Sequence, residues 1–199
     1  VADGDAIEGG TTIVELAGRA CSILTIERTM LNFLQLLSGT ATQAHACVDQ
    51  IKHTKTRVLD TRKTLPGLRI AQKYAVSVGG AKNHRMGLFD AFLIKENHIA
   101  AAGGITTAIN QARALHPNLL VEVEVENLAQ LDEALGAFPD IIMLDNFSTD
   151  EMSIAVKRNN TSAKIEASGG LTLSDLSSVA NTGVDYVSIG AITKNAYSL

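Results

Sequence analysis

The chain has 199 residues, 46% of them hydrophobic and 4% aromatic, and a formal net charge of −4. This length allows one large core, or one domain with a fragment of another. The acidic balance gives no general sign of a nucleic-acid or membrane partner, and no apolar run approaches the ~18 residues of a membrane span. The two cysteines fit neither a metal-binding spacing nor a disulfide framework, so we expect reduced thiols in a cytoplasmic protein.

Residues 1–26 are typical of strands and turns, with turn signals at Asp3-Gly4 and Gly9-Gly10. They are too few to fold alone, so we expect them to be the end of a preceding domain. From Glu27 the apolar spacing predicts a helix that is broadly buried against other elements. Gly39 is expected to break this helix, and a second helix is expected from Thr40 to Ile51.

After residue 51, strand-like and helix-like runs alternate. The strand-like runs lie near residues 57–59, 91–95, 119–125, 141–144, 163–167 and 184–189. The helix-like runs lie near residues 69–78, 104–115, 127–136, 149–158 and 173–181. Alternation of this kind predicts βαβ units and a parallel sheet. The regular spacing of the last four strands favours a closed or nearly closed α/β barrel. The chain has no Gly-x-Gly-x-x-Gly motif after its first strand, which argues against a dinucleotide-binding fold.

Each strand-like run ends in a polar or glycine-rich segment. In chain order these segments are Asp60-Thr61-Arg62-Lys63, Lys95-Glu96-Asn97-His98, Glu124-Val125-Glu126-Asn127, Asp145-Asn146, Ser168-Gly169-Gly170 and Gly190-Ala191. In α/β barrels the chemistry is performed at the carboxyl ends of the strands. The sequence therefore predicts that these segments converge on one pocket.

Positive charge is concentrated between residues 62 and 95. Seven Lys and Arg side chains face one opposing carboxylate there: Arg62, Lys63, Arg69, Lys73, Lys82, Arg85 and Lys95 against Asp90. On its helix Lys73 is expected to be a solvated surface residue. Four of the others lie at strand ends or in the loop Gly79–Leu88: Arg62, Lys63, Arg85 and Lys95. Together with His84 they suit a small ligand with several negative charges, because Arg forms paired hydrogen bonds to carboxylate or phosphate.

The segment VEVEVEN (121–127) alternates valine and glutamate. The valines should pack against helices, so Glu122, Glu124 and Glu126 should point into the barrel, unless the segment is an edge strand with one wetted face. Buried carboxylates need cationic partners or a metal ion. With Asp145 at the next strand end, Glu124 could hold Mg²⁺ or stabilise a developing positive charge.

Small residues follow the last two strands, in SGG (168–170) and SIGA (188–191). They would let backbone N–H groups approach a phosphate, and barrels often bind phosphate in their last two loops. The chain contains no His-Glu-x-x-His, Gly-x-Ser-x-Gly or P-loop motif, which argues against a zinc hydrolase, a serine hydrolase and a P-loop kinase.

Together, several segments resemble the quinolinate phosphoribosyltransferase family. They are ERTMLNFLQLLSGTAT, DTRKTLPGLR, KYAVSVGGAKNHRMGLFDAFLIKENHI, VEVEVEN, IIMLDNF and SIGAITK. The resemblance implies an incomplete, open TIM-like α/β barrel at residues 27–199, with residues 1–26 as the remnant of an amino-terminal α/β sandwich domain. It also implies a homodimer, with higher assemblies left open, in which each site borrows from the partner subunit. The family has more chain before Val1 and a returning segment after Leu199.

The resemblance implies transfer of a phosphoribosyl group from phosphoribosyl pyrophosphate to quinolinate with Mg²⁺. The products would be nicotinate mononucleotide, pyrophosphate and CO₂, in NAD biosynthesis. Arg62, His84, Arg85 and Lys95, with Thr61 beside them, would bind quinolinate, and Arg28 would reach in from the partner subunit. The catalytic residues would be Lys63, Lys95, Glu124 and Asp145, of which the two carboxylates would also serve the metal. The 5′-phosphate would lie in the loops that contain Ser168, Gly169, Gly170, Ile189, Gly190 and Ala191.

Two alternatives remain open from the residues. One is another phosphoribosyl- or phosphate-binding barrel that acts on nicotinate or a related ring acid. The other is a non-catalytic paralogue or a fragment that serves as an assembly subunit.

Overall fold

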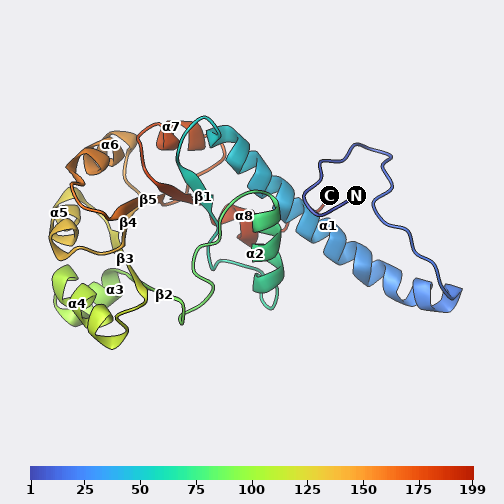
Figure 1. Ribbon diagram of the computed structural model, residues 1–199, viewed down its shortest axis with the longest axis horizontal. Helices are drawn as coiled ribbons and strands as arrows, with labels where there is room; N and C mark the ends of the chain where they lie inside the picture. Colours follow the sequence, from blue (N-terminus) through green and yellow to red (C-terminus); the bar gives the residue numbers. More distant parts are fainter.

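The computed structural model describes residues 1–199, which form a parallel six-stranded sheet with helices on its outer face and one long helix projecting from it (Figure 1). The strands are β1 (Arg57–Leu59), β2 (Ala91–Ile94), β3 (Leu120–Val125), β4 (Ile141–Asp145), β5 (Lys164–Ser168) and β6 (Tyr186–Ser188). They lie in the order β1-β6-β5-β4-β3-β2. All six strands confirm the sequence prediction.

The helices are α1 (Ala20–Ile51), α2 (Arg69–Val78), α3 (Glu96–Ala102), α4 (Ile105–Leu115), α5 (Leu128–Ala137), α6 (Thr149–Arg158), α7 (Leu176–Ala180) and α8 (Ala191–Lys194). The predicted alternation is confirmed. The short helices α3 and α8 were not foreseen, since both begin in segments that read as strand-end loops. Side-chain caps start two of the other helices: Ser148 and Glu151 form a capping box before α6, and Asn127 caps α5.

The sheet curves like part of a barrel but does not close. β1 and β2 are its two edges and do not pair with each other. An isolated bridge between Leu59 and Lys82 is the contact that the free edge of β1 makes instead. The open barrel implied by the resemblance is therefore confirmed, and full closure is excluded.

The long helix α1 runs without a break from Ala20 to Ile51, so the break expected at Gly39 is wrong. Gly39 serves close packing instead, because a Cβ atom there would lie 2.2 Å from the carbonyl oxygen of Tyr197 near the chain's end. A similar approach occurs where α2 ends, since a Cβ atom on Gly79 would lie 2.3 Å from the Ala41 carbonyl oxygen on α1. Small residues at these crossings let backbones pack directly.

The first 19 residues contain turns at Asp3-Gly4 and Gly9-Gly10, as predicted, but no strand. Ile13, Val14 and Leu16 do not alternate regularly with polar residues, so they do not define the apolar face of a strand. All three are exposed. The strands expected in residues 1–26 are therefore wrong, and α1 already begins at Ala20. Their assignment to a sandwich domain stays a prediction. None of the helices combines the length and apolarity that crossing a bilayer requires.

The strand register directs polar side chains into the barrel. On β3, Val121, Val123 and Val125 are buried in the apolar core, which lies between the sheet and its helices. Glu122 and Glu124 are buried on the opposite face, as predicted. Glu126 lies beyond the strand and is exposed, so the expectation that it points into the barrel is wrong.

Candidate active site

The carboxyl ends of the strands surround a cavity of about 750 Å³. Of the residues predicted for the site, it brings together Thr61, Arg62, Lys63, His84, Arg85, Lys95, Glu124, Asp145, Ser168, Gly169, Gly170, Gly190 and Ala191. Two predicted residues do not line it. The side chain of Ile189 is buried in the core, and Arg28 is exposed on α1.

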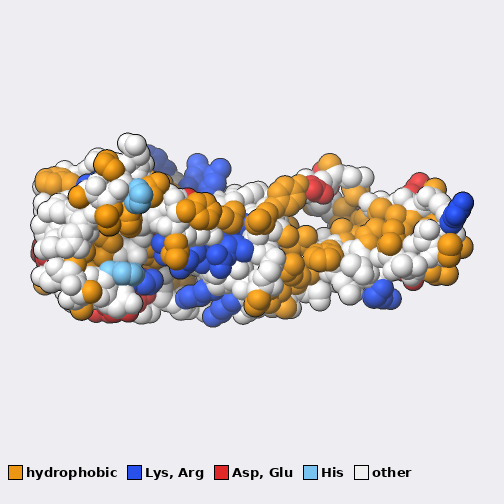
Figure 2. Space-filling view, turned by 90° about the horizontal axis from the view of Figure 1, so that it is seen from below, with side chains coloured by type: hydrophobic (Ala, Val, Ile, Leu, Met, Phe, Trp, Pro, Cys, Tyr) orange, Lys and Arg blue, Asp and Glu red, His pale blue; other side chains and the backbone are white.

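The cavity is strongly cationic although the chain is acidic. Six Lys and Arg side chains line it, against the two carboxylates Glu124 and Asp145: Arg62, Lys63, Arg69, Arg85, Lys95 and Lys194. Figure 2 shows Lys and Arg side chains gathered on one face, between the barrel and the projecting helix. Burial and the positive charge of Arg62 lower the pKa of the Arg85 guanidinium. Two cations therefore face each other here, and a multiply charged anion would relieve their repulsion.

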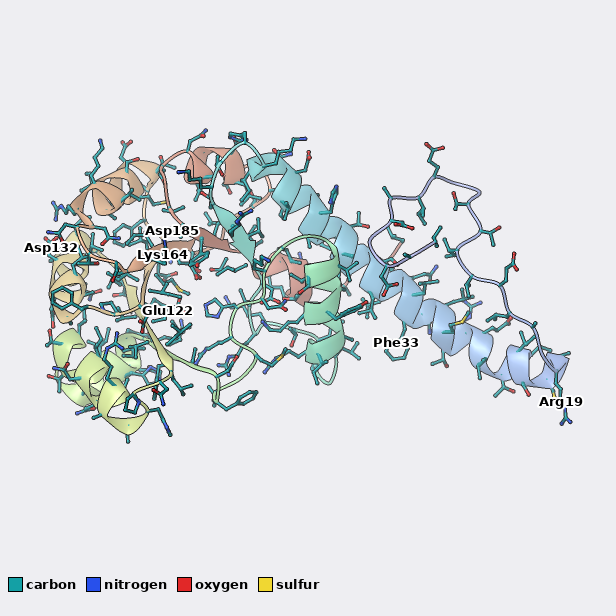
Figure 3. All side chains as sticks on the ribbon, in the orientation of Figure 1. Arg19, Phe33, Glu122, Asp132, Lys164 and Asp185 are labelled. Atoms are coloured by element: carbon teal, nitrogen blue, oxygen red, sulfur yellow. The ribbon has the colours of Figure 1, made fainter.

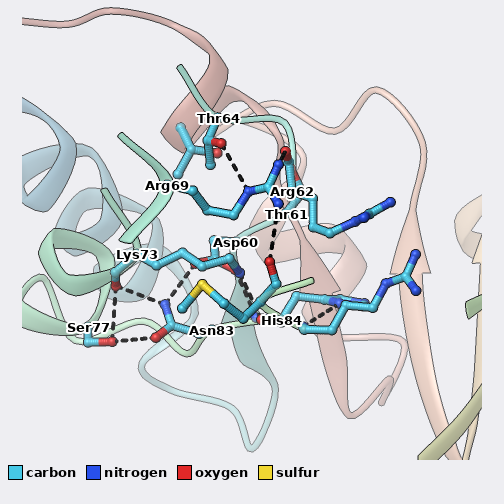
Figure 4. Close-up of polar contacts among 12 residues, drawn as sticks. Asp60, Thr61, Arg62, Thr64, Arg69, Lys73, Ser77, Asn83 and His84 are labelled. Atoms are coloured by element: carbon cyan, nitrogen blue, oxygen red, sulfur yellow. Dashed lines mark hydrogen bonds and ion pairs between the residues drawn. The ribbon is translucent and has the colours of Figure 1, made fainter. Parts of the chain in front are cut away.

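A buried ion pair joins the two loops that carry these cations (Figure 4). Lys73 and Asp60 are both 0% exposed, with Nζ 2.5 Å from Oδ1. Lys73 also donates to the backbone oxygen of His84 at 2.7 Å, and the backbone N–H of His84 donates to Asp60 at 2.8 Å. The prediction that Lys73 is a solvated surface residue is wrong. No periodicity could reveal this contact, because it depends on a loop that returns across the sheet's open edge.

Arg69, one helical turn before Lys73 on α2, is a second residue to which no role was assigned from the sequence. Its guanidinium donates to the backbone oxygens of Arg62 and Met86 and to Thr64 Oγ1, over distances of 3.2–3.3 Å. It therefore links the same two loops. Lys194, Thr172 and Asn195 also line the cavity without having been foreseen.

Glu124 and Asp145 stand at neighbouring strand ends, on β3 and β4. Lys95 forms an ion pair with Glu124 Oε2, and the side-chain amide of Asn146 donates to Asp145 Oδ2. Each carboxylate thus keeps one oxygen without a hydrogen bond inside the chain. Two carboxylates with free oxygens facing a polar cavity are a donor set that fits Mg²⁺, which is commonly bound by one or two carboxylates.

The glycine loops after β5 and β6 also leave donors free. The backbone N–H groups of Gly169, Gly170 and Gly190 donate to no backbone acceptor. Gly169 has φ +103°, and a Cβ atom there would lie 2.3 Å from Asn146 Oδ1, so only glycine fits this approach. Free backbone donors in a cationic cavity suit a phosphate group.

His84, which lines the cavity, forms a cluster with two buried carboxylates, Glu122 and Glu166. The two carboxylates approach His84 Nε2, at 3.0 Å for Glu122 and 3.7 Å for Glu166. Burial lowers the pKa of His84, but the hydrogen bond and charge of Glu122 outweigh this and raise it. Nδ1 accepts the backbone N–H of Arg85 at 2.8 Å, a contact that favours the neutral ring with its proton on Nε2, whereas the raised pKa favours the imidazolium. The predicted role of His84 as a cation therefore stays a prediction.

The Nδ1 contact also argues against a metal ion in the cluster, because a metal ion on Nε2 would leave the imidazole without any proton. Glu166 completes the cluster and was missed by the sequence analysis. Burial, and then the charge of Glu122, raise its pKa to about 8. The signal that could have identified Glu166 is its place as the one carboxylate in the strand K-I-E-A-S, on the face opposite the core residues Ile165 and Ala167.

Known proteins resemble the chain over its whole length. Residues 40–199 match the family model described as Quinolinate phosphoribosyl transferase, C-terminal domain, and residues 1–38 match the N-terminal domain of the same family. The nicotinate-nucleotide pyrophosphorylase [carboxylating] of Mycobacterium leprae is 47% identical over 196 residues, which are 97% of this chain and 69% of that protein. A probable enzyme of the same name from Bacillus subtilis is 44% identical and covers 99% of this chain and 68% of its own length.

Solved structures point to the same family. NadC from Streptococcus pyogenes superposes with a TM-score of 0.96 and 46% identity, covering all of this chain and 70% of that one. The nicotinate-nucleotide pyrophosphorylase from Francisella tularensis gives a TM-score of 0.88 with 54% identity, over 90% of this chain and 64% of that one. The chain thus spans roughly two thirds of the length of these relatives.

Proposed function

The chain belongs to the quinolinate phosphoribosyl transferase family, and we propose that it transfers a phosphoribosyl group from phosphoribosyl pyrophosphate to quinolinate. The products are nicotinate mononucleotide, pyrophosphate and CO₂. One observation carries this proposal: cations, paired carboxylates and unpaired glycine N–H groups meet in a single cavity. The cations match the carboxylates of quinolinate, the paired carboxylates match the ribose and its metal ion, and the glycine N–H groups match the 5′-phosphate.

The cations bind the acceptor. Quinolinate has two adjacent carboxylates, and Arg62, Arg85 and Lys95 stand around the space where they would lie. Guanidinium groups form paired, charge-assisted hydrogen bonds to carboxylates, which fix the orientation of the ring as well as its position. With the ring held, its nitrogen is directed at the anomeric carbon of the ribose.

The carboxylates serve the donor. Ribosyl transfer builds positive charge on the sugar, and Glu124 and Asp145 supply fixed negative charge where it develops. They would also hold Mg²⁺, which when bound neutralises charge on the departing pyrophosphate. Lys63 lies against Gly190, 3.3 Å from the position of its absent Cβ atom, and so stands between the acceptor cations and the phosphate loop. Gly169, Gly170 and Gly190 bind the 5′-phosphate.

Decarboxylation follows from the ring's new charge. After ribosylation the ring nitrogen is cationic and stabilises the electron pair that stays on C2 when the bond from C2 to the departing carboxylate breaks. A proton from water then adds to C2, so the chain needs no separate electron acceptor. We assign Lys95 to the carboxylate that departs. Its ion pair with Glu124 couples the acceptor and donor halves of the site.

The site needs a second subunit. Arg28 belongs to the stretch of α1 between Arg19 and Phe33, which projects away from the barrel (Figure 3). A cation in that position serves the cavity of a partner copy, which supports a homodimer. Location in the cytoplasm stays a prediction from the sequence.

The decisive experiment mixes the full-length protein with quinolinate, phosphoribosyl pyrophosphate and Mg²⁺, with the C2 carboxylate of quinolinate isotopically labelled. Labelled CO₂ and nicotinate mononucleotide should appear in equal amounts, and only when all components are present. Release of neither product by an intact, dimeric protein would favour the non-catalytic alternative.

Nicotinate is the control acceptor, because it lacks the second carboxylate. Several cations converge on the acceptor side, more than one carboxylate requires. We therefore expect nicotinate to bind much more weakly than quinolinate. Equal binding of both acids would favour a related phosphoribosyltransferase.

A further inference from the structure

Two side chains of α2, Arg69 and Lys73, span the gap in the open barrel; we call this pair the α2 bridge. We propose that the α2 bridge is a positioning device that fixes the spacing between the two cation-bearing loops and so sets the affinity for quinolinate. This inference rests on the proposed function. Lys73 contacts no ligand in this scheme, because it is fully buried and does not line the cavity.

The gap makes such a device necessary. In a closed barrel β1 and β2 would pair, and the sheet itself would place the loops beside them. Here the free edge of β1 meets only Lys82, whose backbone exchanges hydrogen bonds with Val58 and Asp60. Beyond residue 82 no sheet hydrogen bond holds the segment that carries His84 and Arg85.

Lys73 supplies the missing connection on the inner side. Its ammonium group binds Asp60, at the end of β1, and the backbone oxygen of His84. Asp60 in turn accepts hydrogen bonds from the His84 backbone N–H and, at 2.7 Å, from the Asn83 side chain. Both sides of the gap thus meet at one ion pair.

Arg69 makes the second connection, nearer the cavity. It donates to the Arg62 backbone oxygen on one loop and to the Met86 backbone oxygen on the other. Arg69 and Lys73 are four residues apart, so they project from the same face of α2. The two contacts together determine both the distance and the tilt between the loops.

Stability alone is a weak reason for a buried ion pair. Removing two charges from water costs about as much as their attraction returns, and neutral replacements of such pairs are often equally stable. The ion pair instead fixes the distance between the two loops, against the repulsion between the like charges that the loops carry. Arg62 and Arg85 carry like charges on the two loops, and burial together with the charge of Arg62 lowers the pKa of Arg85. Ordering loose loops on binding would weaken affinity.

The proposal predicts a selective defect. The phosphate loops belong to β5 and β6, and neither Arg69 nor Lys73 contacts them. Loosening the α2 bridge should therefore weaken quinolinate binding strongly and phosphoribosyl pyrophosphate binding only slightly, because Lys63 alone among the donor-side residues stands in a loop that Arg69 holds. General destabilisation of the fold would affect both substrates alike.

The main test is the double variant Lys73→Met with Asp60→Asn in the full-length protein. It removes both charges together, so no unpaired charge is left buried. We expect an unfolding midpoint near that of the wild type, a KM for quinolinate raised at least about tenfold, and a KM for phosphoribosyl pyrophosphate within about twofold of the wild type. Equal changes in the two KM values, or no change in either, would overturn the proposal.

Asn83→Ala is a milder variant that decides the matter if the double variant does not fold. Asn83 is exposed, and its side chain links Asp60 Oδ2 to the Lys73 backbone oxygen. We expect the same selective rise in quinolinate KM, by about threefold. Lys82→Ala, in the same loop but without a side-chain partner, is the control and should match the wild type. If the wild type makes no nicotinate mononucleotide, the proposed function fails; if it does and the ratio of KM values is unchanged in Asn83→Ala, only the positioning role fails.

Discussion

Arg62 is the residue whose loss tests the acceptor site most directly. Its side chain lines the cavity and donates no hydrogen bond within the chain; only its backbone oxygen is used, by Arg69. Arg62→Ala should therefore leave the fold intact and lower kcat/KM for quinolinate by about 10²–10³, the range for loss of one aligned charged donor. Steady-state kinetics with the unfolding midpoint measure both effects.

The matched control is Arg62→Lys, which keeps the charge but loses the paired hydrogen bonds. We expect it to fall between Arg62→Ala and the wild type. An unchanged kcat/KM for quinolinate in Arg62→Ala would remove Arg62 from the site.

Glu166 makes stability depend on pH. The folded protein holds this proton up to about pH 8, whereas the unfolded chain releases it near 4.5. Between these values the folded state binds more protons, so raising the pH favours unfolding by about 1 kcal/mol per pH unit from this group. Glu166→Gln removes this titrating group. The urea concentration at the unfolding midpoint of the variant should therefore fall less steeply than that of the wild type between pH 5.5 and 8.5.

The control for this effect is Glu126→Gln, at an exposed glutamate just beyond β3. Its pH profile should follow that of the wild type. Parallel profiles for Glu166→Gln and the wild type would show that Glu166 is ionised in the folded protein throughout this range.

Single residues were predictable where their chemistry is local to a strand end. Arg62 and Lys95 come shortly after strands, and Glu124 and Asp145 lie at the ends of strands, so the sequence could place all four at one edge of the sheet. Lys73 could not be placed, because its partner Asp60 lies 13 residues away and is met only when the chain folds back. A charged residue on a predicted helix looks solvated until its neighbour across the fold is known.

Among the elements, the contact between α1 and α2 depends on one glycine. A side chain at Gly79 would meet the Ala41 backbone oxygen at 2.3 Å and the Ala44 Cβ atom at 2.8 Å, and a backbone cannot yield cheaply. Gly79→Ala should force the two helices apart and lower the free energy of unfolding by about 1–3 kcal/mol. Chemical denaturation measures this directly.

Gly136, within α5, provides the opposite case. A Cβ atom there would meet nothing within 4 Å. Gly136→Ala should therefore stabilise the protein by about 0.5–1 kcal/mol, because alanine favours the helix and restricts the unfolded chain. Equal effects at both positions would mean that helix propensity, not the close contact, governs Gly79.

Helices and strands were predictable from the sequence where the periodic spacing of their apolar residues is strong. The six strands and the helices between them follow from short apolar runs with turn signals. The failure at Gly39 is instructive, since glycine disfavours a helix by only about 1 kcal/mol and tertiary packing readily outweighs that. The sequence cannot tell a glycine that ends a helix from one that lets another segment approach.

At the scale of the whole molecule, the open barrel and the projecting helix α1 both bear on how two copies of the chain could associate. The cavity lies at the strand ends, while α1 carries exposed apolar side chains such as Leu24, Ile26 and Phe33 away from the barrel. A helix with this surface favours association, and a two-fold dimer would place each α1 beside the other subunit. Residue patterns predicted the barrel, whereas the proposal of a second copy rests on the resemblance and on the position of Arg28.

The role of Arg28 across the dimer can be tested by complementation. Arg28→Ala and Lys95→Ala should each inactivate a homodimer, because both sites lose a cation. A mixed dimer of the two variants contains one site with the intact barrel of one chain and the intact Arg28 of the other. Random mixing should therefore restore about a quarter of wild-type activity.

The control mixes Lys95→Ala with Arg62→Ala, two variants of the same barrel surface. No arrangement of these chains assembles an intact site, so activity should stay absent. If Arg28 served its own chain's cavity, Arg28→Ala mixed with Lys95→Ala would behave like this control. Recovery in the first mixture alone would place Arg28 in the partner's site and make the dimer the smallest active unit.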